Sequence, residues 1–254
     1  MHQHSVRRLV LCCTLLIASL TGVRTSAQPV QAGIARDAKR GRPLECLHVV
    51  LLDSADKAIA HTVTDSAGRF FLEAPGAGAY RVQFRVHQWE PLTGPLDTLG
   101  DAEFRQRIYP LTFANIVGFD STADADTLTE AERRRRNALA YEQRRASDAE
   151  SGWSSRKPIP EQSGVQYPTE RRRTRTSGRV LAWFIVDSTG STRPSSWEVV
   201  SASDEEFAFA MKRASRTWKW EPARNAGRPV CELTLDYTTF DMTRGFGRIM
   251  FYTR

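Results

Sequence analysis

Residues 203–220 read SDEEFAFAMKRASRTWKW, and the apolar residues of this stretch recur at the spacing of an α-helix. The positions that share one helix face are Phe207, Ala210, Met211, Ala214 and Trp218. Ser203 and Glu206 have the spacing of a capping box, and further acidic residues stand in the first turn, where the helix dipole favours them. The stretch therefore predicts a helix over 204–216 whose apolar face packs against another element.

The residues around this helix have the pattern of β-strands. Residues 178–186, GRVLAWFIV, are apolar on both faces, which indicates a strand that is covered on both sides. Residues 197–200 form a second predicted strand, and residues 230–240 form a last one after a Gly-Arg-Pro turn. The order β-β-α-β over residues 167–240 predicts an α+β fold, in which a helix is packed on a small antiparallel sheet.

An all-β unit is predicted nearer the N-terminus. Tyr80, Val82 and Phe84 alternate with polar residues, as in a strand with one buried and one exposed face. Residues 46–51 are apolar on both faces, and the turn sequence PGAG follows at 75–78. Short strands separated by turns about every 8–12 residues predict a β-sandwich, which we assign to residues 28–113.

The chain between the two predicted domains is charged and polar. Residues 128–145 have a capping box and i,i+4 pairs of acids and arginines, which predict a helix with few apolar positions. The arginine run 133–136 is interpreted as a solvated helix face, with a membrane-surface or cell-wall contact as the alternative. We expect residues 114–164 to be a charged helical linker and residues 165–254 to be the C-terminal domain with a C-terminal extension.

The N-terminus has the features of a secretory signal peptide. Arg7 and Arg8 precede an uncharged apolar run over residues 9–23, which as a helix would rise only about 22 Å, less than the roughly 30 Å of a bilayer core. Small residues at 25–27 fit cleavage after Ala27. Residues 1–27 are therefore predicted to be a signal peptide, with a short inner-membrane anchor through residues 9–23 as the alternative, and the protein is expected in the periplasm.

Composition excludes several classes of protein. With 41% hydrophobic and 26% charged residues, the chain is neither collagen-like, nor wholly disordered, nor a polytopic membrane protein. The formal net charge is +7, but export makes nucleic acid an unsuitable partner. The mature chain would keep Cys46 and Cys231, and alternation places Cys231 on the same face as Leu233. This pattern favours two separate buried thiols, and a Cys46–Cys231 disulfide is the alternative.

No motif of enzyme or metal chemistry is present in the sequence. His48, His61 and His87 are scattered through the predicted sandwich without metal-ligand spacing, and there is no Cys-x-x-Cys, Gly-x-Ser-x-Gly or phosphate-binding loop. Nothing combines a nucleophile with a base. We expect no catalytic residues, no metal site and no cofactor.

The C-terminal unit resembles the TonB C-terminal domain family. The residues that carry the resemblance are Tyr167-Pro168, Gly178-x-Val180, Asp187-x-x-Gly190, the predicted helix, Trp218-x-Trp220-x-Pro222-Ala223, Gly227-x-Pro229-Val230 and Phe240. In this family the domain binds a short "box" segment of outer-membrane receptors, which adds as a β-strand to the edge of its sheet. The resemblance thus implies a non-catalytic protein that binds a TonB-dependent receptor, or another envelope protein, by main-chain pairing.

The resemblance also assigns residues to partner binding. The strand that would receive the partner includes Val230, Cys231, Glu232, Leu233, Thr234, Leu235, Asp236 and Tyr237. Gln166, Tyr167 and Pro168 would flank the bound peptide. Residues 241–254 follow the last predicted strand, and if this tail paired with it, the tail would occupy the edge that a receptor needs.

The N-terminal unit resembles a carboxypeptidase-regulatory-like, transthyretin-type sandwich, through Gly41-x-Pro43-Leu44, Thr62-x-Thr64-Asp65-x-x-Gly68-x-Phe70 and Gly78-x-Tyr80-x-Val82. This resemblance implies a non-catalytic accessory module. The intramembrane histidine and the long proline-rich spacer of energy transducers are missing, so the pattern indicates peptide recognition rather than coupling to a proton-driven motor. Two alternative functions are a structural scaffold of the cell envelope and an accessory subunit of an exported hydrolase.

Overall fold

The computed structural model describes residues 28–86, 91–111, 146, 148–150, 152–159, 164–242 and 248–251, and of residues 237 and 248–251 only the backbone. The predicted signal segment 1–27, the predicted helix 128–145 with its arginine run, and His87 lie outside the described residues. No helix among the described residues is both long and apolar enough to cross a membrane.

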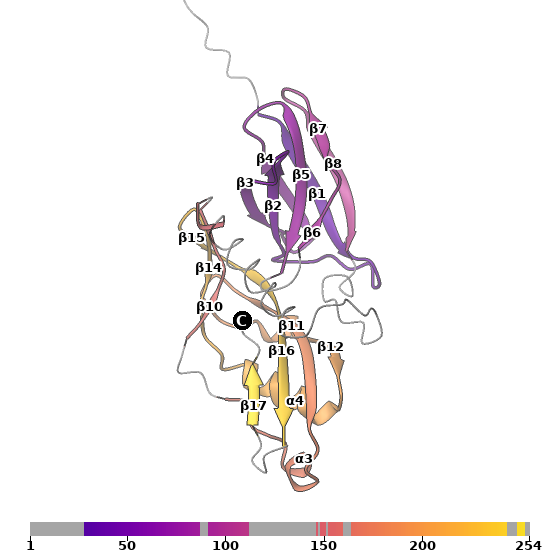
Figure 1. Ribbon diagram of the computed structural model, residues 1–254, viewed down its shortest axis with the longest axis vertical. Coiled ribbons are helices and arrows are strands. Elements are labelled where there is room, and N and C mark those ends of the chain that lie inside the picture. The colour runs from indigo at the N-terminus through magenta and orange to yellow at the C-terminus, as the bar shows by residue number, and fades with distance from the viewer. Residues whose placement is uncertain are drawn as a thin grey trace, which may run out of the picture.

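The N-terminal unit is a sandwich of two sheets, drawn in indigo to magenta in Figure 1. One sheet has the order β4-β1-β8, with β1 (Val30–Asp37), β4 (Arg69–Glu73) and β8 (Phe104–Leu111). The other has the order β3-β2-β5-β6, with β7 also paired to β5, and contains β2 (His48–Asp53), β3 (Ala58–Val63), β5 (Gly78–Arg85), β6 (Leu92–Thr93) and β7 (Asp97–Leu99). The predicted all-β sandwich is confirmed.

Alternation along the strands builds the core of this sandwich. Phe70, Leu72 and Phe84 are buried and belong to one hydrophobic cluster that lies between the two sheets. Gly33 of β1 is required there, because a Cβ at this position would lie 2.5 Å from the Phe70 ring and 2.7 Å from the Tyr109 ring. The cluster of aromatic rings therefore fills the space that a side chain at residue 33 would need.

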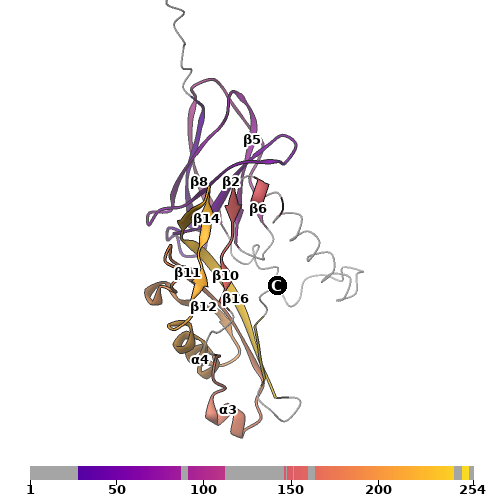
Figure 2. The same cartoon turned by 90° about the vertical axis from the view of Figure 1, so that its left-hand side faces the viewer.

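The C-terminal unit has a four-stranded antiparallel sheet with a helix on one face (Figures 1 and 2). The sheet order is β12-β11-β16-β17, with β11 (Gly178–Val186), β12 (Glu198–Ala202), β16 (Glu232–Asp241) and β17 (Arg248–Phe251). The helices are α3 (Thr169–Arg173), η1 (Pro194–Ser196) and α4 (Glu205–Ser215). The predicted helix on a small antiparallel sheet is confirmed, and α4 begins and ends one residue inside the predicted range.

The N-cap of α4 differs from the prediction. Asp204, and not Ser203, is the N-cap residue, and its carboxylate accepts a hydrogen bond from the Glu206 backbone N–H at 2.9 Å. The Ser203 hydroxyl instead accepts a hydrogen bond from the backbone N–H of Arg179 at the start of β11. Ser203, which the sequence pattern predicts as the capping residue, therefore connects the start of the helix to β11 instead.

The linker and the region after α4 form extra strands that the sequence did not predict. These are β9 (Trp153–Ser154), β10 (Lys157–Pro158), β13 (Trp220–Glu221), β14 (Ala223–Asn225) and β15 (Arg228–Val230). Strands β15, β14 and β9 form one small sheet, and β10 pairs with β13. The single last strand expected over 230–240 is thus divided, because β15 ends at Val230 and β16 begins at Glu232.

The two faces of the C-terminal sheet belong to different cores. Val180, Phe184 and Phe240 lie on the α4 side, in a cluster with Phe207, Met211, Trp218 and Trp220 of the helix and the strand that follows it. Leu181, Trp183, Ile185, Leu233 and Leu235 lie on the opposite face and belong to the same cluster as the sandwich core. The strand that was predicted to be apolar on both faces therefore joins the two units.

Candidate functional site: the last strand and its surroundings

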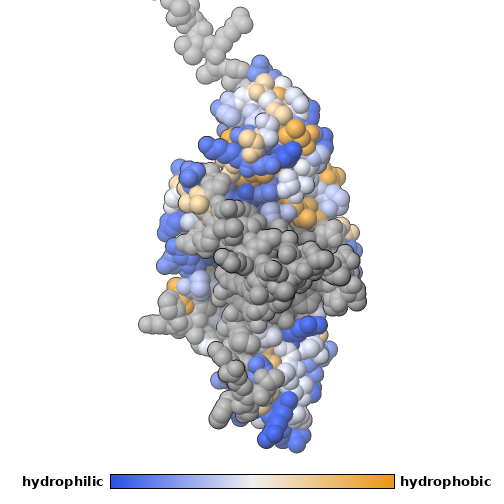
Figure 3. All heavy atoms as spheres, in the orientation of Figure 1, coloured by the Kyte–Doolittle hydropathy of each residue, from blue (hydrophilic) through white to orange (hydrophobic). Residues whose placement is uncertain are grey.

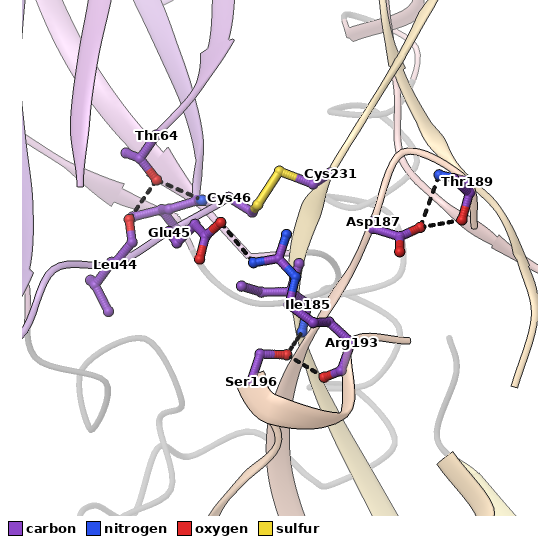
Figure 4. Close-up of a disulfide and its surroundings, with 11 residues drawn as sticks. Leu44, Glu45, Cys46, Thr64, Ile185, Asp187, Thr189, Arg193, Ser196 and Cys231 are labelled. Atoms are coloured by element: carbon purple, nitrogen blue, oxygen red, sulfur yellow. Dashed lines mark hydrogen bonds and ion pairs between the residues drawn. A yellow bond between two sulfur atoms is a disulfide. The ribbon is translucent and has the colours of Figure 1, made fainter. Parts of the chain in front are cut away.

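A disulfide connects the sandwich to the strand β16. Cys46, before β2, is bonded to Cys231, which directly precedes β16, and 185 residues separate them in the sequence (Figure 4). The favoured prediction of two separate thiols was wrong, although Cys231 packs on the same side of the sheet as Leu233 and Leu235, as alternation indicated. Alternation reports the face of a strand but not which distant residue lies opposite.

Polar contacts surround this disulfide. The backbone N–H of Leu233 donates a hydrogen bond to the Cys46 carbonyl at 2.7 Å. Arg193, in the loop after β11, pairs with Glu45 at 2.7 Å, as Figure 4 shows. Arg42 pairs with Glu198 of β12, and its guanidinium lies 4.4 Å from the centre of the Trp183 ring. The first residues of β16 are therefore fixed against the N-terminal unit.

A second contact between the units involves two histidines and the linker. The His48 and His61 rings share a hydrogen bond of 2.9 Å between Nε2 and Nδ1, and the indole of Trp153 stacks on His48 with ring centres 3.6 Å apart. The side-chain amide of Asn225 in β14 donates to the His61 carbonyl at 2.8 Å. These two histidines, which lack metal-ligand spacing in the sequence, connect the sandwich to the sheet β15-β14-β9.

The histidine pair makes the stability of the protein depend on pH. Burial, assisted by the positive charge of Arg85, lowers the pKa of His61 from 6.5 to about 4. Since the unfolded chain takes up a proton on this histidine near pH 6.5 and the folded chain does not, stability is lost as pH falls between these values, by about 2–3 kcal/mol. In denaturant titrations from pH 7 to pH 4, His61→Gln should show a smaller loss than the unsubstituted chain. Parallel curves would contradict this assignment.

A buried ionic cluster occupies the α4 side of β16. Arg156, only 2% exposed, lies across the strand: its backbone N–H donates to Glu232 at 3.0 Å, its Nε to Thr234 at 2.6 Å and its Nη2 to Asp236 at 2.8 Å. Its guanidinium also lies 4.0 Å from the centre of the Trp220 ring. Burial raises the pKa of both carboxyl groups, against the opposing effect of the one arginine.

The structure thus places the predicted strand residues in three environments. Val230 ends β15 and Cys231 is in the disulfide. Glu232, Thr234 and Asp236 face the linker arginine, whereas Leu233 and Leu235 are buried in the core shared with the sandwich. The backbone of Tyr237 pairs with Leu181 of β11. Sequence reasoning missed Arg156, because nothing near it in the sequence indicates that it lies beside β16.

The outer edge of β16 is paired over its last residues only by the C-terminal strand. Thr238, Thr239, Phe240 and Asp241 pair with residues 251, 250, 249 and 248 of β17. Part of the tail that follows the predicted last strand therefore pairs with that strand and occupies the edge that a receptor segment would need.

The segment that was expected to flank a bound peptide lies beside this same end of β16. The Tyr167 ring contacts the rings of Phe240 and Phe207 edge-on, at centre distances of 5.5 and 5.7 Å. Its hydroxyl donates to the Thr176 carbonyl at 2.6 Å, just before β11. Gln166 is exposed, whereas Tyr167 and Pro168 are half-buried. The structure therefore brings Tyr167 of this segment together with Phe240, near the end of β16, rather than with the first half of the strand.

The other edge of the sheet is irregular. In β12, Val199 pairs with Ala182 and Ser201 with Leu181, so Val200 is an extra residue between two neighbouring pairs. Such a β-bulge interrupts the row of main-chain groups that an added strand would need. The side of β16 that carries β17 is thus the regular edge of this sheet.

Comparison with known proteins identifies the family of this domain. Residues 163–238 match the Gram-negative bacterial TonB protein C-terminal family. No curated protein matches the chain.

Three solved structures show only distant similarity. The 5-hydroxyisourate hydrolase of Klebsiella pneumoniae is 17% identical, over 33% of this chain and 90% of that protein, with a TM-score of 0.27. A putative carbohydrate binding protein from Bacteroides uniformis is 8% identical, over 89% of this chain and 96% of that protein, with a TM-score of 0.31. The Bacillus anthracis TIE protein is 9% identical, over 89% of this chain and 31% of that protein, with a TM-score of 0.30. Scores this low carry no argument about function. The family match confirms the sequence-based recognition for residues 163–238, which have the sequence pattern and the helix-on-sheet fold of a TonB C-terminal domain.

Proposed function

We propose that this chain is a non-catalytic protein of the periplasm that takes part in TonB-dependent transport. The observation that carries the proposal is the match of residues 163–238 to the TonB C-terminal family. In the sheet of this domain, the edge of β16 that faces away from β11 is regular. In this role the domain binds a short segment of an outer-membrane receptor, which adds to the sheet as a β-strand.

The partner strand lies along the outer edge of β16. Of the eight residues first assigned to this strand, those up to Asp236 hold the sandwich and the linker in place, so the segment open to exchange is residues 237–241. Tyr167 lies beside this segment, in contact with Phe240, and we expect Tyr167 and the adjoining Pro168 to contact the side chains of the added strand. The pairing itself uses main-chain groups and asks little of the partner's sequence.

In this proposal β17 competes with the receptor segment for one edge. If an internal strand must leave before a ligand can bind, only the fraction of molecules with an open edge is competent to bind. The apparent dissociation constant is the intrinsic one divided by this fraction. A chain that ends at Met242 lacks β17 and is therefore expected to bind box-containing receptor peptides about tenfold more tightly, by isothermal titration calorimetry, than the full chain.

Two substitutions separate the two edges of the sheet. A proline cannot donate a main-chain hydrogen bond, so Thr239→Pro in the shortened chain should abolish peptide binding. Val200→Pro at the bulge of β12 is the matched control and should leave binding unchanged. Binding that is lost with Val200→Pro and kept with Thr239→Pro would refute the assignment of the edge.

A further inference from the structure

The outer face of the sheet β4-β1-β8 is apolar although it is exposed. Phe71, Phe104 and Ile108 expose 59%, 59% and 66% of their surfaces. They point away from the sandwich core, since their neighbours Phe70 and Leu72 point into it. The outer face of a sheet is normally polar, and an exposed apolar face usually marks a contact with another molecule. Orange residues in Figure 3 show that hydrophobic side chains reach the surface of the N-terminal unit.

The opposite outer face of the sandwich is already covered. His48, Val50 and Leu52 of β2 point outward there, but all three are buried, and His48 stacks on Trp153 of β9. The chain thus supplies its own cover for one outer face of the sandwich. On the outer face of β4-β1-β8, by contrast, the large side chains of Phe71, Phe104 and Ile108 are exposed, while the small Ala32 at the centre of the face is buried.

Where all three strands pair, the register arranges this face in three rows across the sheet, and the exposed residues Arg36 and Pro110 extend it beyond the end of β4. One row is Glu73–Val30–Phe104, the middle row is Phe71–Ala32–Gln106, and the third is Arg69–Ile34–Ile108. The two outer rows carry opposite charges at their β4 ends, where Arg69 also pairs with Asp65 of its own chain at 2.8 Å, and an apolar side chain at each of their other positions. The two rows on either side of the middle row therefore match in their apolar side chains but carry charges of opposite sign.

This pattern makes the face complementary to a second copy of itself. A two-fold axis that lies in the interface along the middle row would leave β4 facing β4 and β8 facing β8, with the outer rows exchanged. Arg69 of one copy would then face Glu73 of the other, and Ile108 would face Phe104. By symmetry, the Arg69–Glu73 pair and the Ile108–Phe104 contact each form twice, and no like charges among these residues meet.

We propose that two copies of this chain form a dimer through the outer faces of their β4-β1-β8 sheets, about a two-fold axis along the row Phe71–Ala32–Gln106. The sheets pack face to face, as the two sheets of a sandwich do. Three strands make a small interface, so the dimer dissociates reversibly. The surface lies on the N-terminal unit, on other strands than the edge of β16, and the proposal does not depend on receptor binding.

The first test is the association state of the full chain in solution. Sedimentation velocity between about 1 and 300 µM should show a reversible shift from monomer to dimer, a range suited to a weak interface. Phe71→Ser removes the apolar centre of the face and should leave a monomer throughout this range. Phe209→Ser, at an exposed position of α4, is the matched control and should dimerise as the unsubstituted chain does. A chain that is monomeric at every concentration overturns the proposal.

A charge exchange tests the two-fold register. Glu73→Arg sets two arginines against each other at both ends of the interface and should raise the dimer dissociation constant about tenfold. The double variant Arg69→Glu with Glu73→Arg places opposite charges together again and should return it to within about threefold of the original value. Circular dichroism confirms that each variant is folded. A double variant as weak as the single one, or a dimer that Glu73→Arg leaves unchanged, overturns the proposed geometry.

Discussion

Replacing both bridging cysteines with serine, Cys46→Ser together with Cys231→Ser, should lower the free energy of unfolding by about 2–4 kcal/mol. The disulfide closes a span of 185 residues and thereby restricts the unfolded chain strongly. It also fixes the start of β16 to the sandwich, beside the Leu233–Cys46 hydrogen bond. Denaturant titration followed by tryptophan fluorescence measures this loss, since Trp153 and Trp183 lie near the contact between the units.

A chemical control accompanies the cysteine variant. A dithiol reductant should lower the stability of the unsubstituted chain to that of the double serine variant, and it should leave the variant itself unaffected. The variant is also expected to unfold over a broader range of denaturant, because the two units are coupled less tightly without the bridge. Equal stability of variant and parent in the absence of reductant would show that the bridge does not connect the two units.

The second large effect is expected at Arg156. Arg156→Met leaves Glu232 and Asp236 buried beside the strand without a cation, and removal of one partner from a buried ionic cluster costs about 3–5 kcal/mol. The linker strands β9 and β10 flank Arg156 in the sequence, so we expect them to become accessible to proteases in this variant. Thermal unfolding and limited proteolysis measure the two consequences.

The effect of Arg156→Met should depend on pH. Burial raises the pKa values of Glu232 and Asp236 above those in the unfolded chain, and loss of the arginine raises them further. The folded variant therefore takes up protons at a higher pH than its unfolded chain does, so its stability falls as pH rises from about 4 towards 7. The deficit relative to the parent should be smallest near pH 4.

Two further variants isolate the electrostatic cause. Arg156→Met combined with Glu232→Gln and Asp236→Asn has no buried charge in the cluster and should recover much of the loss. Lys157→Met, next in sequence but with an exposed side chain, should have little effect on stability. A loss in Arg156→Met that is the same at every pH and persists in the neutral variant would indicate a packing role for Arg156 rather than an ionic one.

Local periodicity was sufficient to predict the helix α4 and the strand β11 of the C-terminal unit. The helix α4 shows its apolar face at every turn, and β11 is apolar on both faces because α4 covers one and the core shared with the sandwich contains the other. In both cases the environment of an element repeats along its length and is therefore visible in the sequence.

Periodicity could not show which distant segments meet. Glu232, Thr234 and Asp236 alternate with leucines, which normally indicates an exposed polar face, yet Arg156 of the linker covers them. The partner of Cys231 likewise lies in the other unit. Such contacts depend on which distant segments the fold brings together. This produces no periodic pattern of residues in either segment.

The candidate site shows the same division. The sequence predicted a strand over residues 230–240, and the family resemblance placed Tyr167 beside the peptide that this strand would bind. In the structure Tyr167 contacts Phe240, near the end of β16. It did not predict that the first half of this strand is held by the sandwich and the linker. The stretch available to a partner is consequently shorter, residues 237–241, and β17 pairs with residues 238–241 of it.

Hydrogen exchange of the backbone amides, mapped by mass spectrometry on the full chain with and without a box-containing receptor peptide, shows which edge of the sheet the peptide binds. If the peptide replaces β17 on the edge of β16, peptide binding should increase exchange in residues 248–251 and preserve the protection of residues 238–241, while β12 stays unchanged. Protection that appears along β12, with β17 undisturbed, would contradict the proposed binding edge.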